Sequence, residues 1–133
     1  MLTSNGVECM LVGGYAVIYY GYTRTTGDME LWIAVSPANA QRVADTVRQF
    51  GFTSGINANA FLQQGKMFRM GMPPIRIELL TVISGIDFPD AYSRAVDATI
   101  DGISVKVIGL ADLRANKRAS GRAKDQADLA NLP

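Results

Sequence analysis

Three carboxylates in mostly apolar segments are the side chains of this sequence best suited to chemistry. Asp28 and Glu30 are separated by one residue in Gly-Asp-Met-Glu-Leu-Trp-Ile, and Glu78 lies in Arg-Ile-Glu-Leu-Leu. Alternate residues of a β-strand point to the same side, so Asp28 and Glu30 would share one face, about 6.5 to 7 Å apart along the chain. If the strand that carries Glu78 is a neighbour, the three acids converge and repel one another unless a divalent cation neutralises them. The pattern therefore predicts an oxygen-ligated metal site, with Mg²⁺ as the natural ion.

A strand, a helix and a second strand are expected to position the first two acids. Residues 7–12 form a short, mostly apolar segment that ends at Gly13-Gly14, and a helix is expected over residues 15–20. In the strand expected over residues 28–35, apolar residues alternate with the acids and would face a core. The carboxylates are thus predicted to lie at the edge of a packed sheet.

Two predicted hairpins and four helical segments complete the chain. Residues 66–70 and 75–82 are expected to pair as strands through a turn with two prolines, which cannot lie inside a central ladder. A shorter hairpin is expected over residues 99–107, with Asp101-Gly102 at its turn. Helices are predicted after the Ser-Pro N-cap at 36–37 as far as Gly51, at 87–95, at 109–119 and at 124–132, with a helical turn within 57–63. Together these elements predict one α/β (α+β) domain over residues 1–133.

Composition excludes several classes of protein. The 133 residues carry a formal charge of +1 and 48% hydrophobic residues, as in ordinary globular domains, and no global charge indicates a nucleic acid or membrane partner. There is no His, so catalytic triads and the usual zinc hydrolase sites are excluded. The single Cys9 cannot form an internal disulfide, and no signal peptide or membrane-length apolar segment is present, so a cytoplasmic location is expected.

Four segments give the sequence a resemblance to a known superfamily. It resembles the nucleotidyltransferases of the DNA polymerase β type, and within them the small bacterial minimal nucleotidyltransferases and AbiEii toxin-like proteins. The segments are Leu11-Val12-Gly13-Gly14, Arg24 and Thr26 before Asp28-Met29-Glu30-Leu31, Ile77-Glu78-Leu79, and the basic segment Asn116 to Asp125. The resemblance covers nearly the whole chain and implies a nucleotidyltransferase fold, with a mixed central sheet flanked by helices and helices at the C-terminus.

The resemblance also implies roles for individual residues. Gly13 and Gly14 would open a helix whose backbone amides receive nucleotide phosphates. Asp28 and Glu30 would hold two Mg²⁺ ions that orient a nucleoside triphosphate. Glu78 would share a metal and help to deprotonate the attacking hydroxyl. In the superfamily Asp is commoner than Glu at the second and third acid positions, and each Glu moves its carboxylate outward by one methylene.

The cations near the acids and near the C-terminus are candidates for phosphate contacts. Five of the thirteen Lys and Arg residues lie within 114–124, and of these Lys117, followed by Lys124, is the predicted phosphate ligand. Asp125 and Asp128 are expected to pair with neighbouring cations at helical spacing. Arg24 is predicted either to bind phosphate or to brace the acids by a salt bridge.

Three functions remain open at this stage. The first is a Mg²⁺-dependent enzyme that transfers a nucleoside monophosphate from a nucleoside triphosphate to a hydroxyl of a protein, an RNA or a small molecule. One version of this function is the toxin-like half of a toxin–antitoxin pair. The second is a catalytically degenerate nucleotide-binding or interaction module of the same fold. The third is a metal-dependent phosphohydrolase, which the glycine pair and the absence of His make less favoured.

Overall fold

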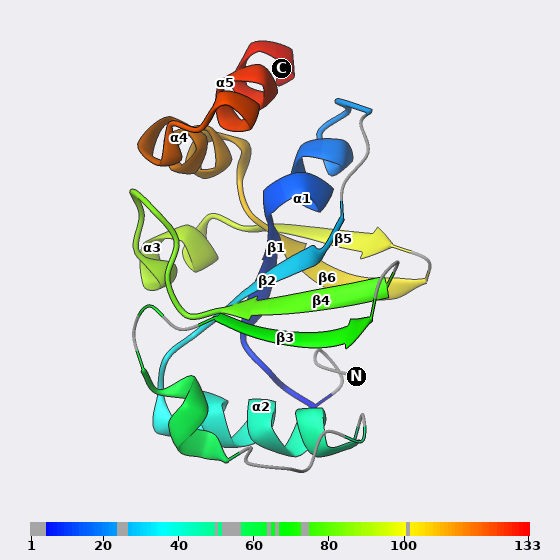
Figure 1. Ribbon diagram of the computed structural model, residues 1–133, viewed down its shortest axis with the longest axis vertical. Helices are drawn as coiled ribbons and strands as arrows, with labels where there is room; N and C mark the ends of the chain where they lie inside the picture. Colours follow the sequence, from blue (N-terminus) through cyan, green and yellow to red (C-terminus); the bar gives the residue numbers. More distant parts are fainter. Residues whose placement is uncertain are drawn as a thin grey trace.

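A six-stranded mixed sheet organises the protein (Figure 1). The computed structural model describes residues 5–23, 27–49, 51, 57–63, 65, 67–72, 75–100 and 102–133. The strands of this part are β1 Cys9–Val12, β2 Met29–Ile33, β3 Met67–Met72, β4 Ile75–Leu80, β5 Val96–Ile100 and β6 Ile103–Val107. The helices are α1 Gly13–Tyr19, α2 Pro37–Gln49, α3 Phe88–Ser93, α4 Leu110–Ser120 and α5 Ala123–Asn131, with a 3-10 turn η1 at Ala58–Phe61. The predicted α+β class is confirmed, including the C-terminal helices.

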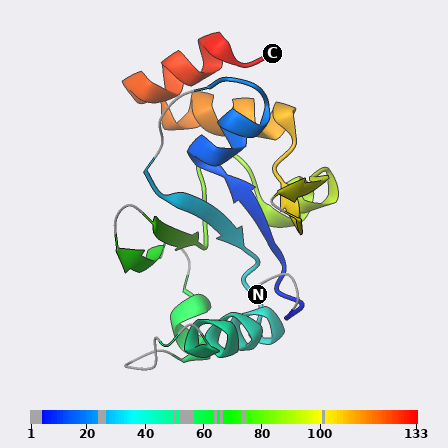
Figure 2. The same cartoon turned by 90° about the vertical axis from the view of Figure 1, so that its right-hand side faces the viewer.

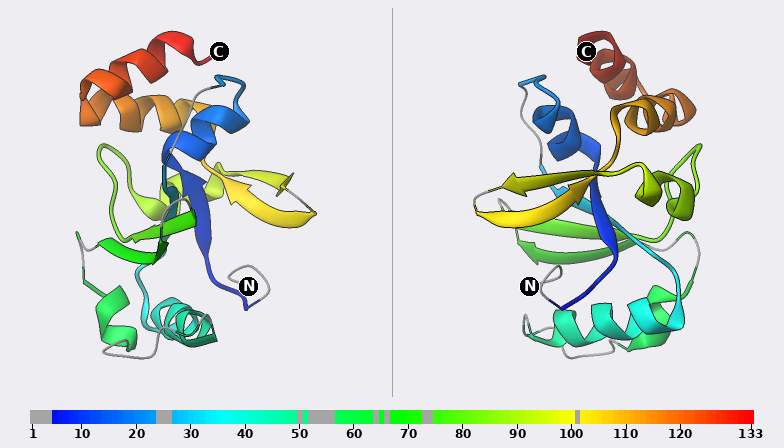
Figure 3. Two further views of the ribbon diagram at one scale, coloured as in Figure 1. Left: turned by 45° about the vertical axis from the view of Figure 1, so that its right-hand side comes forward. Right: turned by 180° about the vertical axis from the view of Figure 1, so that it is seen from behind.

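The strands follow the order β3-β4-β2-β1-β6-β5. β2 lies antiparallel to β1 and parallel to β4, and β1 lies parallel to β6. The β3–β4 and β5–β6 pairs are antiparallel, which confirms both predicted hairpins, and the β5–β6 hairpin extends to one side of the molecule (Figure 3). The sheet is therefore mixed, as the resemblance implied.

Helices cover the two faces of the sheet unequally. α2 and η1 lie below it, and α1, α4 and α5 lie above it (Figures 1 and 2). α2 turns a buried apolar stripe inward, because its buried small and branched residues recur at helical spacing: Ala40, Val43, Ala44 and Val47. Leu31 of β2 is buried in the same core, whereas Glu30, whose side chain points to the opposite face, is half-buried. Of the helices in the described residues, none has the length and apolarity needed to cross a bilayer.

Several element boundaries differ from the sequence prediction. α1 begins directly at Gly13 rather than at Tyr15, and β5 begins at Val96 rather than at Thr99. β3 continues through Gly71 and Met72, while Pro73 and Pro74 lie outside the described residues. Alternation cannot locate such ends, because pairing with a neighbouring strand extends or stops a strand independently of its own sequence.

Candidate functional site

The sheet brings the three predicted acids to one face. In the parallel pair β2–β4, Glu30 lies directly beside Glu78, and Asp28 precedes β2 by one residue. The same register pairs Leu31 with Leu79, and both of these side chains are buried. Because successive side chains alternate, burial of this leucine pair turns Glu30 and Glu78 toward the opposite face, below α1.

Asp28 and Glu78 are neighbouring carboxylates whose interaction shifts the pKa of each. A hydrogen bond from Arg76 lowers the pKa of Asp28, and the hydrogen bond with Glu78 lowers it further. Burial is the main cause that raises the pKa of Glu78, and the interaction with Asp28 raises it further. The hydrogen bond and positive charge of Arg69 act in the opposite direction and lower it. The environments push the two pKa values apart, so Asp28 is the more acidic member of the pair and Glu78 is the more basic one.

Two arginines of the β3–β4 hairpin hold this pair. Arg76 Nε lies 2.8 Å from Asp28 Oδ1, and Arg69 Nε lies 3.0 Å from Glu78 Oε1. Arg69 is the register partner of Glu78 across β3 and β4. Sequence reasoning missed both residues as parts of the site. Arg76 could have been found, since it is two residues from Glu78 and shares its face, whereas Arg69 depends on the hairpin register.

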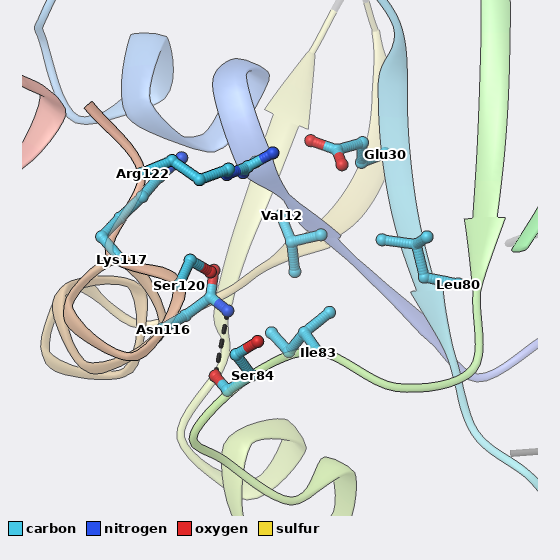
Figure 4. A pocket seen from close by; sticks show the side chains of 10 residues that line it. Val12, Glu30, Leu80, Ile83, Ser84, Asn116, Lys117, Ser120 and Arg122 are labelled. Atoms are coloured by element: carbon cyan, nitrogen blue, oxygen red, sulfur yellow. Dashed lines mark hydrogen bonds between the residues drawn. The ribbon is translucent and has the colours of Figure 1, made fainter. Parts of the chain in front are cut away.

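Glu30 takes a separate position on the same face. Its carboxylate occupies the space beside Gly13, where a Cβ atom would overlap it, and it points toward Arg122 (Figure 4). The hydrogen bond to Asp125 raises the pKa of Arg122, and the negative charge of Glu30 contributes to the same increase. Glu30 therefore faces the C-terminal helices rather than the Asp28–Glu78 pair.

Three carboxylates were predicted to converge, but only Asp28 and Glu78 lie together, while Glu30 lies apart. Within the described part of the chain, no group of three or more Cys, Asp or Glu side chains is gathered closely enough to hold a metal ion. Mg²⁺ is usually bound by one or two carboxylates together with substrate phosphates rather than by a complete protein cage. The adjacent oxygens of Asp28 and Glu78 fit that mode of binding.

A cavity of about 520 Å³ opens over these carboxylates. It lies within the range of roughly 300 to 1,000 Å³ that is common for small-molecule sites. One wall carries the three acids with Arg69 and Arg76, and the opposite wall is formed by Gly14 and cations of the last two helices: Lys117, Arg122 and Lys124. Both predicted acids and predicted cations therefore face one space.

A second cavity of about 330 Å³ adjoins the first through Glu30, Lys117 and Arg122, which line both. Its walls are partly apolar, from Val12, Leu80 and Ile83, and partly polar (Figure 4). On the polar side, Asn116 Nδ2 donates to the carbonyl oxygen of Ser84 at 3.0 Å. This hydrogen bond ties α4 to the loop after β4 at the wall of the second cavity.

Lys117 is held by carboxylates of α5. Its Nζ lies 3.1 Å from Asp125 Oδ1 and 3.0 Å from Asp128 Oδ2, and all three side chains are at most 4% exposed. Arg122 also binds Asp125, at 2.7 Å, which confirms the predicted pairing at helical spacing for that aspartate. Burial acts to raise the pKa of Asp125, but the hydrogen bonds from Arg122 and Lys117 outweigh it and lower that pKa.

The other predicted ligands of a nucleotide are placed as follows. Gly13 and Gly14 are buried at the start of α1, and Gly14 lines the larger cavity. Lys124 is exposed at the start of α5 and lines the same cavity. Lys117 reaches both cavities, but its ammonium is engaged by two carboxylates. Arg24 lies outside the described residues.

A mixed sheet that presents carboxylates beside a glycine-led helix is the arrangement expected for a nucleotidyltransferase. The chain belongs to the family described as "Nucleotidyl transferase of unknown function (DUF2204)", whose family model matches residues 1–133. Among curated proteins, none gave a significant match to the chain. The family description indicates nucleotidyl transfer and leaves the acceptor open.

Replacing Gly13 with alanine is expected to destabilise the protein more than the same change at Gly121. Both glycines have φ of +66°, and this left-handed conformation costs an L-residue about 1 to 2 kcal/mol. A Cβ at Gly13 would also overlap the Glu30 carboxylate, whereas at Gly121 the nearest atom is Arg118 O at 3.8 Å. Chemical denaturation should show an additional loss of about 1 to 3 kcal/mol for Gly13→Ala. Equal losses would mean that Glu30 moves aside freely.

Proposed function

We propose that this protein transfers a nucleoside monophosphate from a nucleoside triphosphate to a hydroxyl group, with Mg²⁺ bound by the acids of the larger cavity. The observation that carries the proposal is the Asp28–Glu78 pair, two contacting carboxylates with opposed pKa shifts on the wall of a cavity rich in cations. Membership of a family described as a nucleotidyl transferase supports the same reaction.

In this reaction the acceptor oxygen attacks the α-phosphorus, the bond from that phosphorus to the bridging oxygen of the β-phosphate breaks, and pyrophosphate leaves. Glu78 accepts the proton of the acceptor hydroxyl and passes it to solvent, a role suited to a carboxyl group whose pKa is raised. Asp28 stays ionised beside it. Bound Mg²⁺ would supply Lewis-acid stabilisation of charge on the phosphates.

The charges around the cavity suit a triphosphate with its metal ions. The five cations that line it are balanced by five carboxylates, namely its own three acids and the two aspartates that hold Lys117. Because these charges cancel, two bound Mg²⁺ ions would make the site positively charged, and the negative charge of a triphosphate would neutralise them. Gly14 lets the chain approach the phosphates closely, because it has no side chain. Lys124 and Arg122 line the cavity opposite the acids and would complete the phosphate site.

The acceptor in this proposal is a hydroxyl of a protein, an RNA or a small molecule. In a toxin-like version of the function, the transfer inactivates a cellular acceptor, and an antitoxin partner covers the two cavities. This version predicts that the partner blocks nucleotide binding.

A catalytically degenerate nucleotide-binding module is the second candidate. The observation that favours it is that Arg76 and Arg69 already occupy Asp28 and Glu78, while Glu30 stands apart. Such a module would bind a triphosphate without turnover.

The experiment that tests the enzyme uses α-labelled forms of all four nucleoside triphosphates with Mg²⁺ and a broad panel of acceptors. Label transfer and pyrophosphate release are measured for the wild type and for a variant with Asp28→Ala, Glu30→Ala and Glu78→Ala. Transfer by the wild type alone supports the enzyme. Equal pyrophosphate release by both proteins rejects it, and calorimetric triphosphate binding without turnover favours the degenerate module.

A further inference from the structure

The two arginines that hold the carboxylate pair are placed where they would meet a bound triphosphate. Arg69 and Arg76 line the same cavity as Asp28, Glu78 and Lys124. Their side chains are 54% and 34% exposed, whereas those of Glu78 and Asp28 are 9% and 16% exposed. The two acids are thus mostly buried in the wall, while the two arginine side chains are more exposed to solvent.

We propose that Arg76 and Arg69 are partner-exchanging residues, which bind Asp28 and Glu78 when the cavity holds no substrate and bind the triphosphate when metal takes their place on the carboxylates. This inference rests on the proposed function and adds two phosphate-binding residues to it. It also assigns a role to the Arg76–Asp28 and Arg69–Glu78 ion pairs, which hold the two adjacent carboxylates in place before the substrate binds.

Competition for the same oxygen atoms is the physical basis of the exchange. Arg76 Nε is bound to Asp28 Oδ1, and Arg69 Nε is bound to Glu78 Oε1, so an incoming divalent cation must displace these contacts. Ion pairs with exposed partners are weak because water solvates the separated charges well. A guanidinium that leaves a carboxylate is also well suited to a phosphate, which it binds through two parallel hydrogen bonds.

Lys117, which lines the same cavity from the opposite wall, shows a contrasting arrangement. Its ammonium is almost fully buried between Asp125 and Asp128, which are themselves buried. Separating that group from its carboxylates would leave uncompensated charges in the interior. Arg69 and Arg76 can therefore exchange their carboxylate partners for phosphate, whereas Lys117 cannot.

Coupling between metal and triphosphate follows from the exchange. Metal on the carboxylates frees the guanidinium groups for phosphate, and phosphate that holds the guanidinium groups frees the carboxylates for metal. Each ligand should increase the affinity for the other by the same factor. Without a triphosphate, the wild-type site should bind a divalent cation only weakly.

The test uses Arg76→Gln and Arg69→Gln, with Arg48→Gln as the matched control. Arg48 pairs with Asp45 at 3.2 Å on α2, below the sheet and away from the cavity. The first probe is Mn²⁺ alone, with binding measured by electron paramagnetic resonance. The second is inorganic triphosphate with Mg²⁺, with binding measured by calorimetry, which avoids any dependence on the base. Circular dichroism confirms that each variant is folded.

The two probes are expected to change in opposite directions. Each cavity variant should bind Mn²⁺ about 3-fold more tightly than the wild type, because a competitor is removed. Each should bind the magnesium triphosphate about 10-fold more weakly, because a phosphate ligand is lost. The Arg48→Gln control should match the wild type with both probes.

Other outcomes overturn the inference in distinct ways. If the affinities for Mn²⁺ and for magnesium triphosphate both fall in the variants, the arginines only hold the acids in place. If both affinities rise, the arginines only compete with the two ligands for the site. Either result leaves the proposed function intact when the wild type binds the magnesium triphosphate. If the wild type binds no inorganic triphosphate, the phosphate half of the exchange fails, and label transfer from nucleoside triphosphates then decides separately whether the proposed function fails as well.

Discussion

Replacing Lys117 with methionine is expected to lower the free energy of unfolding by about 3 to 5 kcal/mol. Lys117 Nζ sits between Asp125 Oδ1 at 3.1 Å and Asp128 Oδ2 at 3.0 Å, and the three residues are at most 3% exposed. Methionine keeps most of the side-chain volume but removes the charge. Two buried carboxylates would then lose a shared cation, and burial penalises the charged form of each. Urea denaturation followed by circular dichroism measures the loss.

Two comparisons separate this charge effect from a packing effect. Lys106 pairs with Asp97 at 2.8 Å, but this pair is exposed, so Lys106→Met should change the unfolding midpoint much less. Adding Asp125→Asn and Asp128→Asn to Lys117→Met should restore part of the lost stability. If the triple variant is no more stable than the single one, the loss comes from packing rather than from uncompensated charge.

The stability loss should also depend on pH. Hydrogen bonds from Arg122 and Lys117 hold the pKa of Asp125 below its ordinary value. A group whose folded-state pKa is lowered contributes stability that is present above the pKa of the unfolded chain and is lost as pH falls through the folded value. The difference between wild type and Lys117→Met should therefore be full near neutral pH and smaller in acid.

Lys117 also illustrates what the sequence could and could not predict about the site. Five cations within 114–124, taken with the predicted triphosphate, indicated Lys117 as a phosphate ligand, and the structure does place Lys117 in the cavity wall. The chain turns at Gly121, however, so that α5 folds back beside α4 and brings Asp125 and Asp128 to this ammonium. The angle between two helices depends on how their faces pack, and residue spacing within one helix does not determine it.

The strands that carry the acids were more predictable. Alternation of apolar and charged residues predicted that Asp28 and Glu30 share a face, and burial of the leucines on the other face is the physical reason. The neighbour relation of Glu30 and Glu78 was only a conditional expectation, because parallel pairing joins segments far apart in the chain. The turn of Glu30 into the space beside Gly13 was not predictable, since it depends on a missing Cβ atom in another element.

Replacing Asp28 with asparagine is expected to reduce nucleotidyl transfer by roughly 100-fold to 1,000-fold, if the proposed function holds. Asp28 is the member of the carboxylate pair whose pKa is lowered, so it keeps its negative charge over the wider pH range and would hold the metal. Asparagine keeps the shape and one acceptor oxygen but removes this charge. The measurement is the initial rate of pyrophosphate release at saturating Mg²⁺ and nucleoside triphosphate.

The control removes an ion pair elsewhere whose aspartate is far more exposed, 85% against 16% for Asp28. Asp97 accepts a hydrogen bond from Lys106 at 2.8 Å on the β5–β6 hairpin, as Asp28 does from Arg76 on the β3–β4 side of the sheet. Asp97→Asn should leave the rate unchanged, and the two variants should have unfolding midpoints close to that of the wild type. Equal rates for Asp28→Asn and Asp97→Asn would remove Asp28 from the reaction.

Glu30→Gln gives the last distinction, because Glu30 lines the same cavity without joining the pair. If Glu30 holds metal together with Asp28 during turnover, its replacement should lower the maximal rate by a similar factor. If it instead only orders Arg122, the KM for the triphosphate should rise while the maximal rate changes little, because Arg122 faces the cavity from the opposite wall. Asp28 and Glu30, which alternate on one face in the sequence pattern, are thus expected to differ in the kinetic parameter that each one changes.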